Sequence, residues 1–213
     1  IHPIGEKNRK GTLGSYYSVK DFQAINPEFG SMEDFKELVD EIHRLDMKVI
    51  IDWVANHTAF DNIWIENGKL DWYTLDSLGN LQPPLGTDWW DVADLNYDNL
   101  EMRQEMIKSM KFWLKETNID GFRCDVADWV PIDFWKECIE ELKKEKSVFM
   151  LAEAENPELH RVGFDATYAW HFHFVMNEIA QNKKFANDIK KYIKNKSKEF
   201  SKSSYRLHFT SNH

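Results

Sequence analysis

The chain has 213 residues, 42% of them hydrophobic, which is enough to bury one large core or two small ones. Lys and Arg number 27 against 36 Asp and Glu, so the net charge is -9 and we expect no nucleic-acid partner. The longest apolar runs are far shorter than the roughly 20 residues of a transmembrane helix, so we also expect no membrane-spanning segment.

The predicted elements alternate between helix and strand along the chain. Residues 31–46 open with Ser31 and Asp34 in a capping pattern and repeat apolar residues at helical spacing, and the apolar run 47–54 follows as a strand covered on both faces. The later predictions, in chain order, are a helix at 99–116, a strand at 120–126, a helix at 132–144 and strands at 147–154, 163–170 and 205–212.

This alternation, without hairpin signals, predicts an α/β fold with a parallel sheet. The segment 58–96 interrupts it, because this segment is rich in glycine, proline and aromatic residues and has no helical period. We therefore expect three parts: 1–57, an irregular insertion at 58–96, and 97–213. Four tryptophans of the insertion are predicted to lie in loops and to offer flat faces for sugar rings: Trp64, Trp72, Trp89 and Trp90.

Polar residues gather where the predicted strands end. They are Asp52, Asn56 and His57 on the first strand, Arg123, Asp125 and Asp128 on the second, Glu153 and Glu155 on the third, and Ser211, Asn212 and His213 on the last. Burying charges without partners costs several kcal/mol. Since the carboxyl ends of parallel strands converge on one face, a shared site is the simplest explanation.

Arg123 and Asp125 lie two positions apart on a strand, so their side chains face the same way. Such a pair on its own is more often a buried salt bridge than a catalytic centre. We expect the guanidinium to lower the pKa of Asp125 and keep it ionised as a nucleophile, while Glu153, on a more apolar strand, has its pKa raised and donates a proton. Glu155 is the alternative acid, and Glu153 is favoured because Asn156 and Pro157 end the strand.

Five short motifs resemble those of the α-amylase family of retaining glycoside hydrolases. "DWVANH" (52–57), "GFRCDVADW" (121–129), "LAEAE" (151–155) and "FTSNH" (209–213) are similar to the family's four main motifs, and "VADLN" (92–96) to a fifth. Their order and spacing agree over essentially the whole chain.

The resemblance implies a role for each matching residue. Asp125 is the implied nucleophile, Glu153 the general acid/base and Arg123 the residue that positions Asp125. The implied sugar-binding residues are Tyr17, Asp52, His57 and His213, to which we add Asp128 beside the second motif. Asn56 and Asp94 are similar to the family's calcium ligands, although two ligands fall short of the six to eight oxygens that calcium takes.

The resemblance also implies an incomplete (β/α)8 TIM barrel, running from the end of its second strand to its seventh, with the irregular insertion after the third barrel strand. The family's third catalytic aspartate follows directly after the position of His213, so we expect this polypeptide to be a fragment that is inactive by itself.

The implied activity is retaining hydrolysis of α-1,4-glucosidic bonds in starch, glycogen or maltooligosaccharides, with an α-glucan as the partner. Alternatives are an α-1,6-glucosidase, a transglycosylase, a trehalose-forming relative and a non-catalytic glucan-binding homologue. "VADLN" differs from the "QPDLN" form associated with α-1,6 specificity, which favours α-1,4 cleavage. The sequence leaves the compartment open, and an extracellular or periplasmic location is compatible with it.

Overall fold

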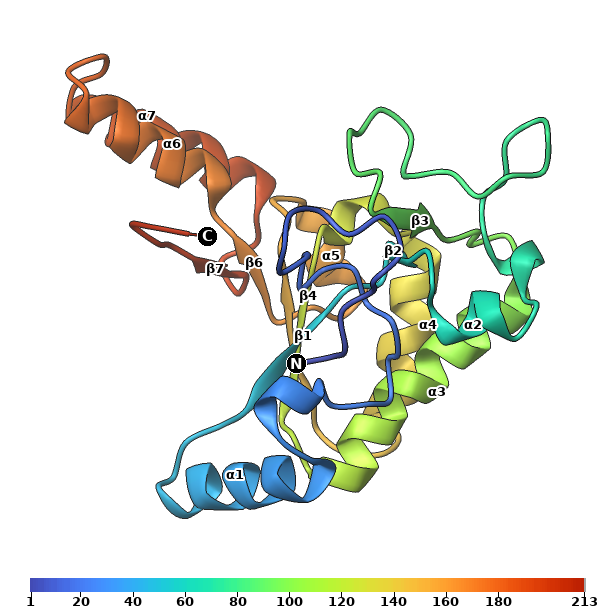
Figure 1. The fold of residues 1–213 in the computed structure, drawn as a ribbon. Coiled ribbons are helices and arrows are strands. Elements are labelled where there is room, and N and C mark those ends of the chain that lie inside the picture. Colours follow the sequence, from blue (N-terminus) through green and yellow to red (C-terminus); the bar gives the residue numbers. More distant parts are fainter. Residues whose placement is uncertain (213) are drawn as a thin grey trace.

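Five parallel strands form the central sheet of the computed structural model, which describes residues 1–212 (Figure 1). In sheet order they are β1 (Ile50–Trp53), β4 (Gly121–Cys124), β5 (Phe149–Ala152), β6 (Ala166–Tyr168) and β7 (Tyr205–Leu207). Within this sheet each strand is hydrogen-bonded to the strand of the same sheet that follows it in the sequence, as in a (β/α)8 barrel. The α/β class is confirmed, and the sheet is an open arc, an incomplete (β/α)8 barrel.

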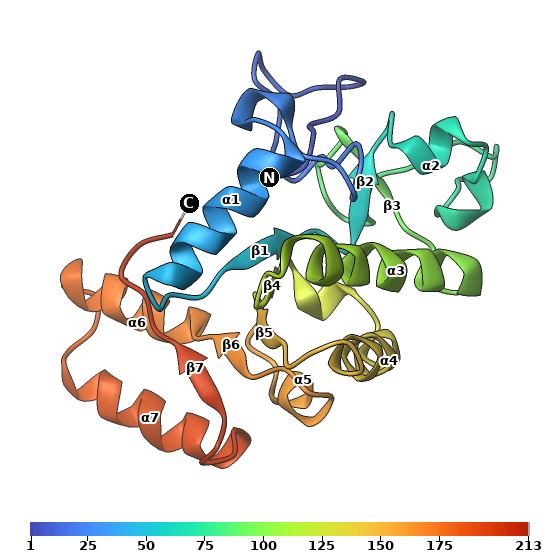
Figure 2. The ribbon, with the colours of Figure 1, turned by 90° about the horizontal axis from the view of Figure 1, so that it is seen from below.

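Helices cover the outer face of this arc (Figures 1 and 2). The helices of the chain are α1 (Met32–Arg44), α2 (Ile63–Glu66), α3 (Leu100–Thr117), α4 (Ile132–Lys143), α5 (Pro157–Arg161), α6 (Trp170–Ala180) and α7 (Asn187–Glu199). The predicted helices at 31–46, 99–116 and 132–144 are thereby confirmed as α1, α3 and α4. Helices α6 and α7 pack together and project from the β6 end of the sheet.

The start of α1 shows how local sequence sets an element boundary. The Ser31 hydroxyl accepts the backbone N–H of Asp34 at 3.2 Å, and the Asp34 carboxylate accepts the N–H of Ser31 at 2.7 Å. Two donors that the first helical turn leaves without partners are satisfied in this way. On the inward side of the helix, Phe35 meets the ring of Trp113 edge to face at 5.6 Å.

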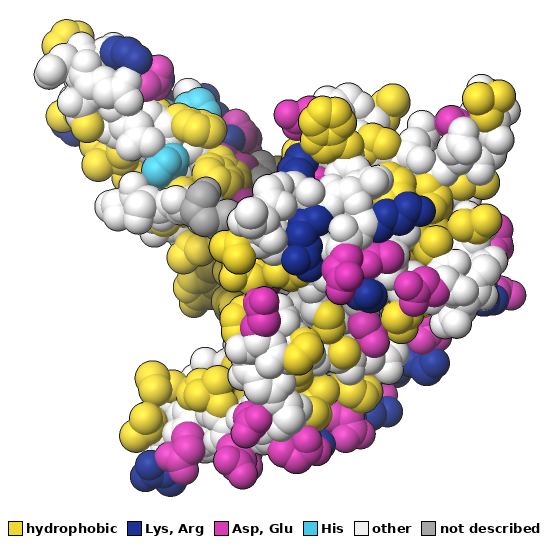
Figure 3. Space-filling model, viewed as in Figure 1, with side chains coloured by type: hydrophobic (Ala, Val, Ile, Leu, Met, Phe, Trp, Pro, Cys, Tyr) yellow, Lys and Arg dark blue, Asp and Glu magenta, His cyan; other side chains and the backbone are white. Residues whose placement is uncertain are grey.

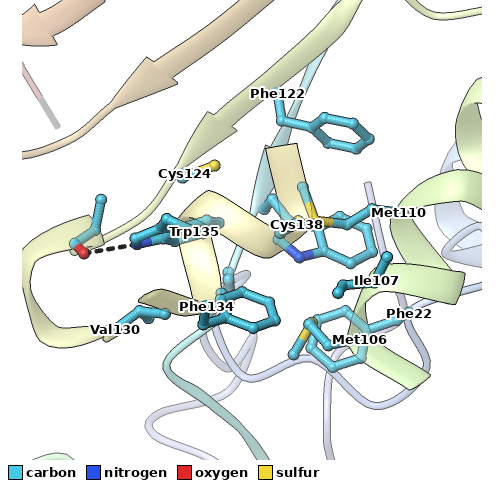
Figure 4. Packing of buried hydrophobic residues seen from close by; sticks show 14 of the residues in the cluster. Phe22, Met106, Ile107, Met110, Phe122, Cys124, Val130, Phe134, Trp135 and Cys138 are labelled. Atoms are coloured by element: carbon cyan, nitrogen blue, oxygen red, sulfur yellow. Dashed lines mark hydrogen bonds between the residues drawn. The ribbon is translucent and has the colours of Figure 1, made fainter. Parts of the chain in front are cut away.

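Strand alternation divides the side chains of the sheet between two environments. Phe122 and Cys124 point into a closely packed core between the sheet and helices α3 and α4 (Figure 4). In that core the Trp135 indole N–H donates to the carbonyl of Ala127 at 2.9 Å. Arg123, between the two core residues, must therefore face the other, concave side of the sheet.

The concave side is only partly covered. Leu151, Ala166 and Tyr168 form a small apolar cluster there, and Figure 3 shows a hollow lined by hydrophobic side chains between the α1 lobe and the α6–α7 lobe. In β1, Ile51 and Trp53 are buried whereas Asp52 is exposed. The expectation that this strand is covered on both faces is wrong, because its concave side faces the hollow.

The insertion folds against the N-terminal residues and contains its own two-stranded antiparallel sheet, β2 (His57–Ala59) with β3 (Val92–Asp94). The N–H of Ala59 donates to the carbonyl of Val19 at 2.9 Å, which joins the two parts. Three 3-10 turns complete the fold: η1 (Pro27–Phe29), η2 (Leu70–Trp72) and η3 (Ala127–Trp129). The division at residues 57 and 96 stays a prediction.

Two of the insertion's tryptophans contradict the expected role as sugar platforms. Trp64 and Trp72 are buried, their rings meet edge to face at 5.2 Å, and Phe22 lies 5.1 Å from Trp64. They belong to the core because the N-terminal residues pack over the insertion and provide apolar surface that the local sequence does not reveal.

No helix within residues 1–212 is long and apolar enough to cross a membrane.

We expect Gly121→Ala to destabilise the sheet strongly. A Cβ at position 121 meets the backbone carbonyl oxygen of Phe149 at 1.9 Å, and a backbone atom in the neighbouring strand has no room to move. A cost of about 3 kcal/mol or more in the free energy of unfolding, measured by urea denaturation, is the expected result. The control Gly79→Ala meets nothing within 4 Å and should cost only about 1 kcal/mol for its positive φ. Equal stability of the two variants would contradict this account.

Candidate active site

The Arg123 guanidinium is the centre of a charged cluster on the concave side of the sheet. Its Nη1 donates to Asp52 Oδ1 and to Asp125 Oδ1, both at 2.8 Å, and its Nη2 lies 3.0 Å from Glu153 Oε1. The last contact is an ion pair that lacks the alignment of a hydrogen bond. The structure thus brings together three of the predicted site carboxylates, from three adjacent strands, around one cation.

The register of the sheet explains this convergence. Asp52 pairs with Arg123, and Arg123 pairs with Leu151, so these three residues form one row across β1, β4 and β5. Asp125 and Glu153 each follow directly after the last residue of their strand. The N–H of Asp125 donates to the Trp53 carbonyl and the N–H of Glu153 to the Cys124 carbonyl, both at 2.9 Å, so the sheet pattern continues and the two residues form the next row on the same face. The side chains of Arg123, Asp125 and Glu153 are 8%, 9% and 13% exposed, so they are largely shielded from water.

Glu153 is also held by the segment that follows Asp125. The N–H of Val126 donates to Glu153 Oε2 at 3.1 Å, and the N–H of Ala127 donates to the Glu153 carbonyl at 3.3 Å. Val126 has φ 37° and ψ 47°, a left-handed conformation that β-branched residues rarely adopt. This sharp turn directs the Val126 N–H at the acid, so the backbone beside one carboxyl group fixes the other.

Asp125 differs from the expectation in the direction of its pKa. Burial raises the pKa from 3.8 to about 7, and the charges of Glu153 and Asp52 add to this, whereas Arg123 lowers it. The prediction that Arg123 holds the pKa of Asp125 low is therefore wrong. One guanidinium does not neutralise three carboxylates in a place shielded from water. The carboxyl groups of the cluster titrate together, so a proton bound here is not assigned to a single residue.

Arg123 stays charged in this setting. Burial lowers the pKa of its guanidinium, but the carboxylates of Asp52 and Glu153 outweigh burial and raise it above the usual range. The ring of Tyr168 lies 5.6 Å from the guanidinium carbon and covers it on the apolar side.

Glu155, the alternative acid, lies outside this cluster. Its Oε1 pairs with Arg206 Nη2 and, at 3.3 Å, with Lys196 Nζ, and its Oε2 accepts the N–H of His171 at 2.6 Å. These partners come from β7, α7 and α6, so Glu155 ties the end of β5 to the projecting helices. Because the strand ends at Ala152, Glu155 no longer follows the alternation that points Glu153 at Arg123.

The sugar-binding predictions fall into three groups. Tyr17 and His57 border the cluster: the Tyr17 hydroxyl donates to Asp52 Oδ2 at 3.4 Å, and burial raises its pKa. Burial lowers the pKa of His57 to about 4, so this ring is neutral at pH 7. Asp128 is the exposed middle residue of η3 and accepts a hydrogen bond from the Asn156 side-chain amide at 2.9 Å. His213 lies outside the described residues.

A cavity of about 340 Å³ opens at the cluster and is a suitable place for a ligand. Its lining residues are Lys10, Ser15, Tyr17, His57, Trp89, Asp91, Val92, Asp125, Val126 and Glu153. Trp89 was expected to offer its ring to sugar. Trp90 instead borders a separate hollow beside residues 8–11.

Lys10 and Asp91 are the cavity residues that sequence reasoning missed. Lys10 Nζ lies 3.2 Å from the buried Asp91 carboxylate and bridges the N-terminal loop and the insertion. Nothing in either local sequence marks this pair, because the partners are 81 positions apart and meet only in the folded chain.

Asn56 and Asp94, the predicted calcium ligands, lie on adjoining segments. In the β2–β3 sheet Asp94 lies opposite His57 in the strand register, and the N–H of Leu95 donates to the carbonyl of Asn56 at 3.2 Å. Burial raises the pKa of Asp94, and within residues 1–212 no Lys or Arg forms an ion pair with it. A desolvated carboxylate without a cationic partner fits a metal ligand. Over the same residues, no three His, Cys, Asp or Glu side chains converge as a metal site, so an ion held here would need amide, carbonyl or water oxygens for the rest of its ligands.

Comparison with known families decides the class to which this site belongs. A family model described as the alpha amylase catalytic domain matches residues 2–213, and this range holds the whole charged cluster. The chain belongs to the α-amylase family. The predicted family resemblance is confirmed.

Similar solved structures agree with the α-amylase fold. An α-amylase from Lactobacillus plantarum is 35% identical with a TM-score of 0.93 over 100% of this chain and 54% of its own. A noncanonic maltogenic α-amylase, AmyB from Thermotoga neapolitana, is 33% identical with a TM-score of 0.93 over 100% of this chain and 49% of its own.

A curated relative, alpha-amylase 3 of Dictyoglomus thermophilum, is 32% identical over 197 residues, 78% of this chain and 39% of the relative. The chain therefore spans well under two thirds of this relative's length and about half that of the two solved structures.

The raised pKa of Asp125 predicts that Asp125→Asn stabilises this α-amylase-family chain more at pH 8 than at pH 5. The folded chain binds the Asp125 proton more tightly than the unfolded chain does, so the wild type loses stability as the pH rises from about 4 to about 7. The asparagine variant does not lose this stability, because its side chain does not titrate in this pH range. Relative to the wild type it should gain about 2 kcal/mol between pH 5 and pH 8, measured by urea unfolding at both values.

Asp76→Asn is the matched control, because hydrogen bonds from Asn80 lower the pKa of this exposed carboxylate. Its stability difference from the wild type should be the same at pH 5 and at pH 8, because a carboxyl pKa below 3.8 places its titration below both values. A difference for Asp125→Asn that is the same at pH 5 and pH 8 would remove the burial explanation.

Proposed function

We propose that the protein to which this catalytic region belongs hydrolyses α-1,4-glucosidic bonds of starch, glycogen or maltooligosaccharides with retention of anomeric configuration. The observation that carries the proposal is the position of Asp125 and Glu153 on one guanidinium, at the mouth of one cavity. Two carboxyl groups on either side of a glycosidic bond are the machinery of glycoside hydrolysis.

Asp125 is the proposed nucleophile. Its carboxylate oxygen forms a bond to the anomeric carbon while the bond from that carbon to the leaving oxygen breaks, and Glu153 gives its proton to that oxygen. In the second half, Glu153 takes a proton from water. The water oxygen attacks the anomeric carbon, and the ester to Asp125 breaks, which restores both carboxyl groups.

The contacts of Arg123 support this division of labour. Arg123 donates a hydrogen bond to Asp125, which favours a negative charge there when substrate arrives, whereas its contact with Glu153 is an ion pair without hydrogen-bond alignment. In this proposal Glu153 supplies the proton. Tyr17, Asp52 and His57 border the same space, and we propose that they contact the sugar at the cleavage point. A neutral His57 donates a hydrogen bond to a sugar hydroxyl without adding charge.

The proposal of retention rests on the two carboxyl groups lying close together. A separation of about 5 to 5.5 Å leaves no room for water between the nucleophile and the sugar, so a covalent intermediate forms first. Both carboxylates contact nitrogens of the same guanidinium, which agrees with the short class. Since "VADLN" lacks the "QPDLN" form, we propose α-1,4 rather than α-1,6 cleavage.

We expect Asp125→Asn and Glu153→Gln each to lower kcat on maltohexaose by roughly 10³-fold in the complete protein, because each removes one half of the double displacement. Glu155→Gln is the control. It keeps the shape of a neighbouring carboxylate that pairs with Arg206 instead of Arg123, and per folded molecule it should retain activity within a few-fold. NMR of the first product should show the α-anomer. An equal loss of kcat in Glu155→Gln, or a β-anomeric first product, would overturn the assignment.

We also propose that calcium braces the start of the insertion. The Asp94 carboxylate and the Asn56 side-chain oxygen would hold the ion, and its chemistry there is charge neutralisation and stiffening of the β2–β3 pair. None of the catalytic steps requires it.

Calcium at 100 times its Kd should raise the free energy of unfolding by about 2.7 kcal/mol, measured by thermal or urea unfolding with and without a chelator. Asp94→Asn should abolish this gain, whereas Asp76→Asn, in an exposed turn, should keep it. No calcium-dependent stabilisation of the wild type would refute the proposal.

A further inference from the structure

Two tryptophans from different segments meet beside the catalytic cavity. Trp89 belongs to the insertion and lines the cavity, and Trp129 ends η3 after β4. Their rings are stacked, with centroids 5.1 Å apart and planes 16° from parallel. The His57 ring meets Trp89 edge to face at 5.5 Å, so an aromatic row runs outward from the carboxylate cluster.

The row leaves a large apolar face in water. Trp129 is 50% exposed although one face of its ring lies on Trp89. A half-exposed indole stacked on a residue that lines a ligand cavity is the informative kind of exposed apolar residue, because folding alone gains little from it. Flat apolar faces of this kind stack on the C–H faces of sugar rings.

The backbone that carries each ring is anchored by hydrogen bonds. The backbone N–H of Trp89 donates to the Thr87 hydroxyl at 3.3 Å, and Lys10 binds both the Asp91 carboxylate and, at 3.2 Å, the Asp88 carbonyl on either side of Trp89. The backbone N–H of Trp129 donates to the carbonyl of Val126 at 2.9 Å. With the two rings also stacked on each other, less freedom is lost when a ligand binds, which favours affinity.

We infer that the Trp89–Trp129 pair is a second sugar-binding position, which holds a glucose ring on the leaving-group side of the cleavage point. This inference rests on the proposed function. The side follows from the contacts of η3: Trp129 lies on the turn whose Val126 and Ala127 N–H groups bind Glu153, the residue that protonates the leaving oxygen. The pair therefore selects α-glucans long enough to reach past the cleavage point.

The test uses the complete protein with Asp125→Asn, so that no turnover disturbs binding, and titrates it with maltose and maltohexaose by calorimetry. Adding Trp129→Ala should weaken maltohexaose binding by roughly tenfold, the factor that corresponds to about 1.4 kcal/mol, and should change maltose binding much less. Trp129→Phe should restore most of the affinity, because it keeps an aromatic face.

Trp90→Ala is the matched control: it removes a neighbouring exposed indole that borders a separate hollow, and it should leave both affinities unchanged. Maltohexaose should also change the tryptophan fluorescence of the Trp90→Ala protein and lose that effect in Trp129→Ala. Equal maltohexaose affinity with and without Trp129 would overturn the inference. Absence of hydrolysis by the wild type with Trp129-dependent binding would overturn the proposed function alone.

Discussion

The contact between Arg123 and three carboxylates is the constraint on which the site depends. Arg123, Asp125 and Glu153 are well shielded from water, where charges are costly, and each is tolerated only because the others and the more exposed Asp52 are in place. The geometry cannot be supplied by one strand. It needs β1, β4 and β5 in a fixed register, so that Asp52 lies beside Arg123 and Glu153 comes one row later. The parallel sheet is in this sense the scaffold of an electrostatic arrangement, and the helices on its outer face hold the strands in that register.

The cluster is held from the backbone side as well. Val126 accepts a left-handed conformation that its branched side chain disfavours, a cost of order 1–3 kcal/mol. In return its N–H reaches Glu153, and the following turn carries Trp129 to the rim of the cavity. A strained residue between the proposed nucleophile and the Trp89–Trp129 pair is expected where function, rather than stability, sets the conformation.

Much of the fold follows from local pattern. The capping residues Ser31 and Asp34 marked the start of α1, and the alternation of Phe122, Arg123 and Cys124 gave the two faces of β4. What local pattern missed depends on the folded surroundings. Burial is the largest influence on the pKa of Asp125, and the residues next to it in the sequence do not show how deeply it is buried. Trp64 and Trp72 looked like loop residues, but the N-terminal segment covers them.

The order of the strands also bears on how the chain reaches this state. Leu151 pairs with Ala166, 15 positions on, and Gly121 with Phe149, 28 positions on, whereas Ile50 pairs with Gly121, 71 positions on, across the whole insertion. Closing a longer loop costs more entropy, so contacts between distant segments form after local ones. Pairing of β1 with β4 is the step that brings Asp52 to Arg123. The charged cluster around Arg123 is therefore complete only once the strand contact with the largest sequence separation has formed.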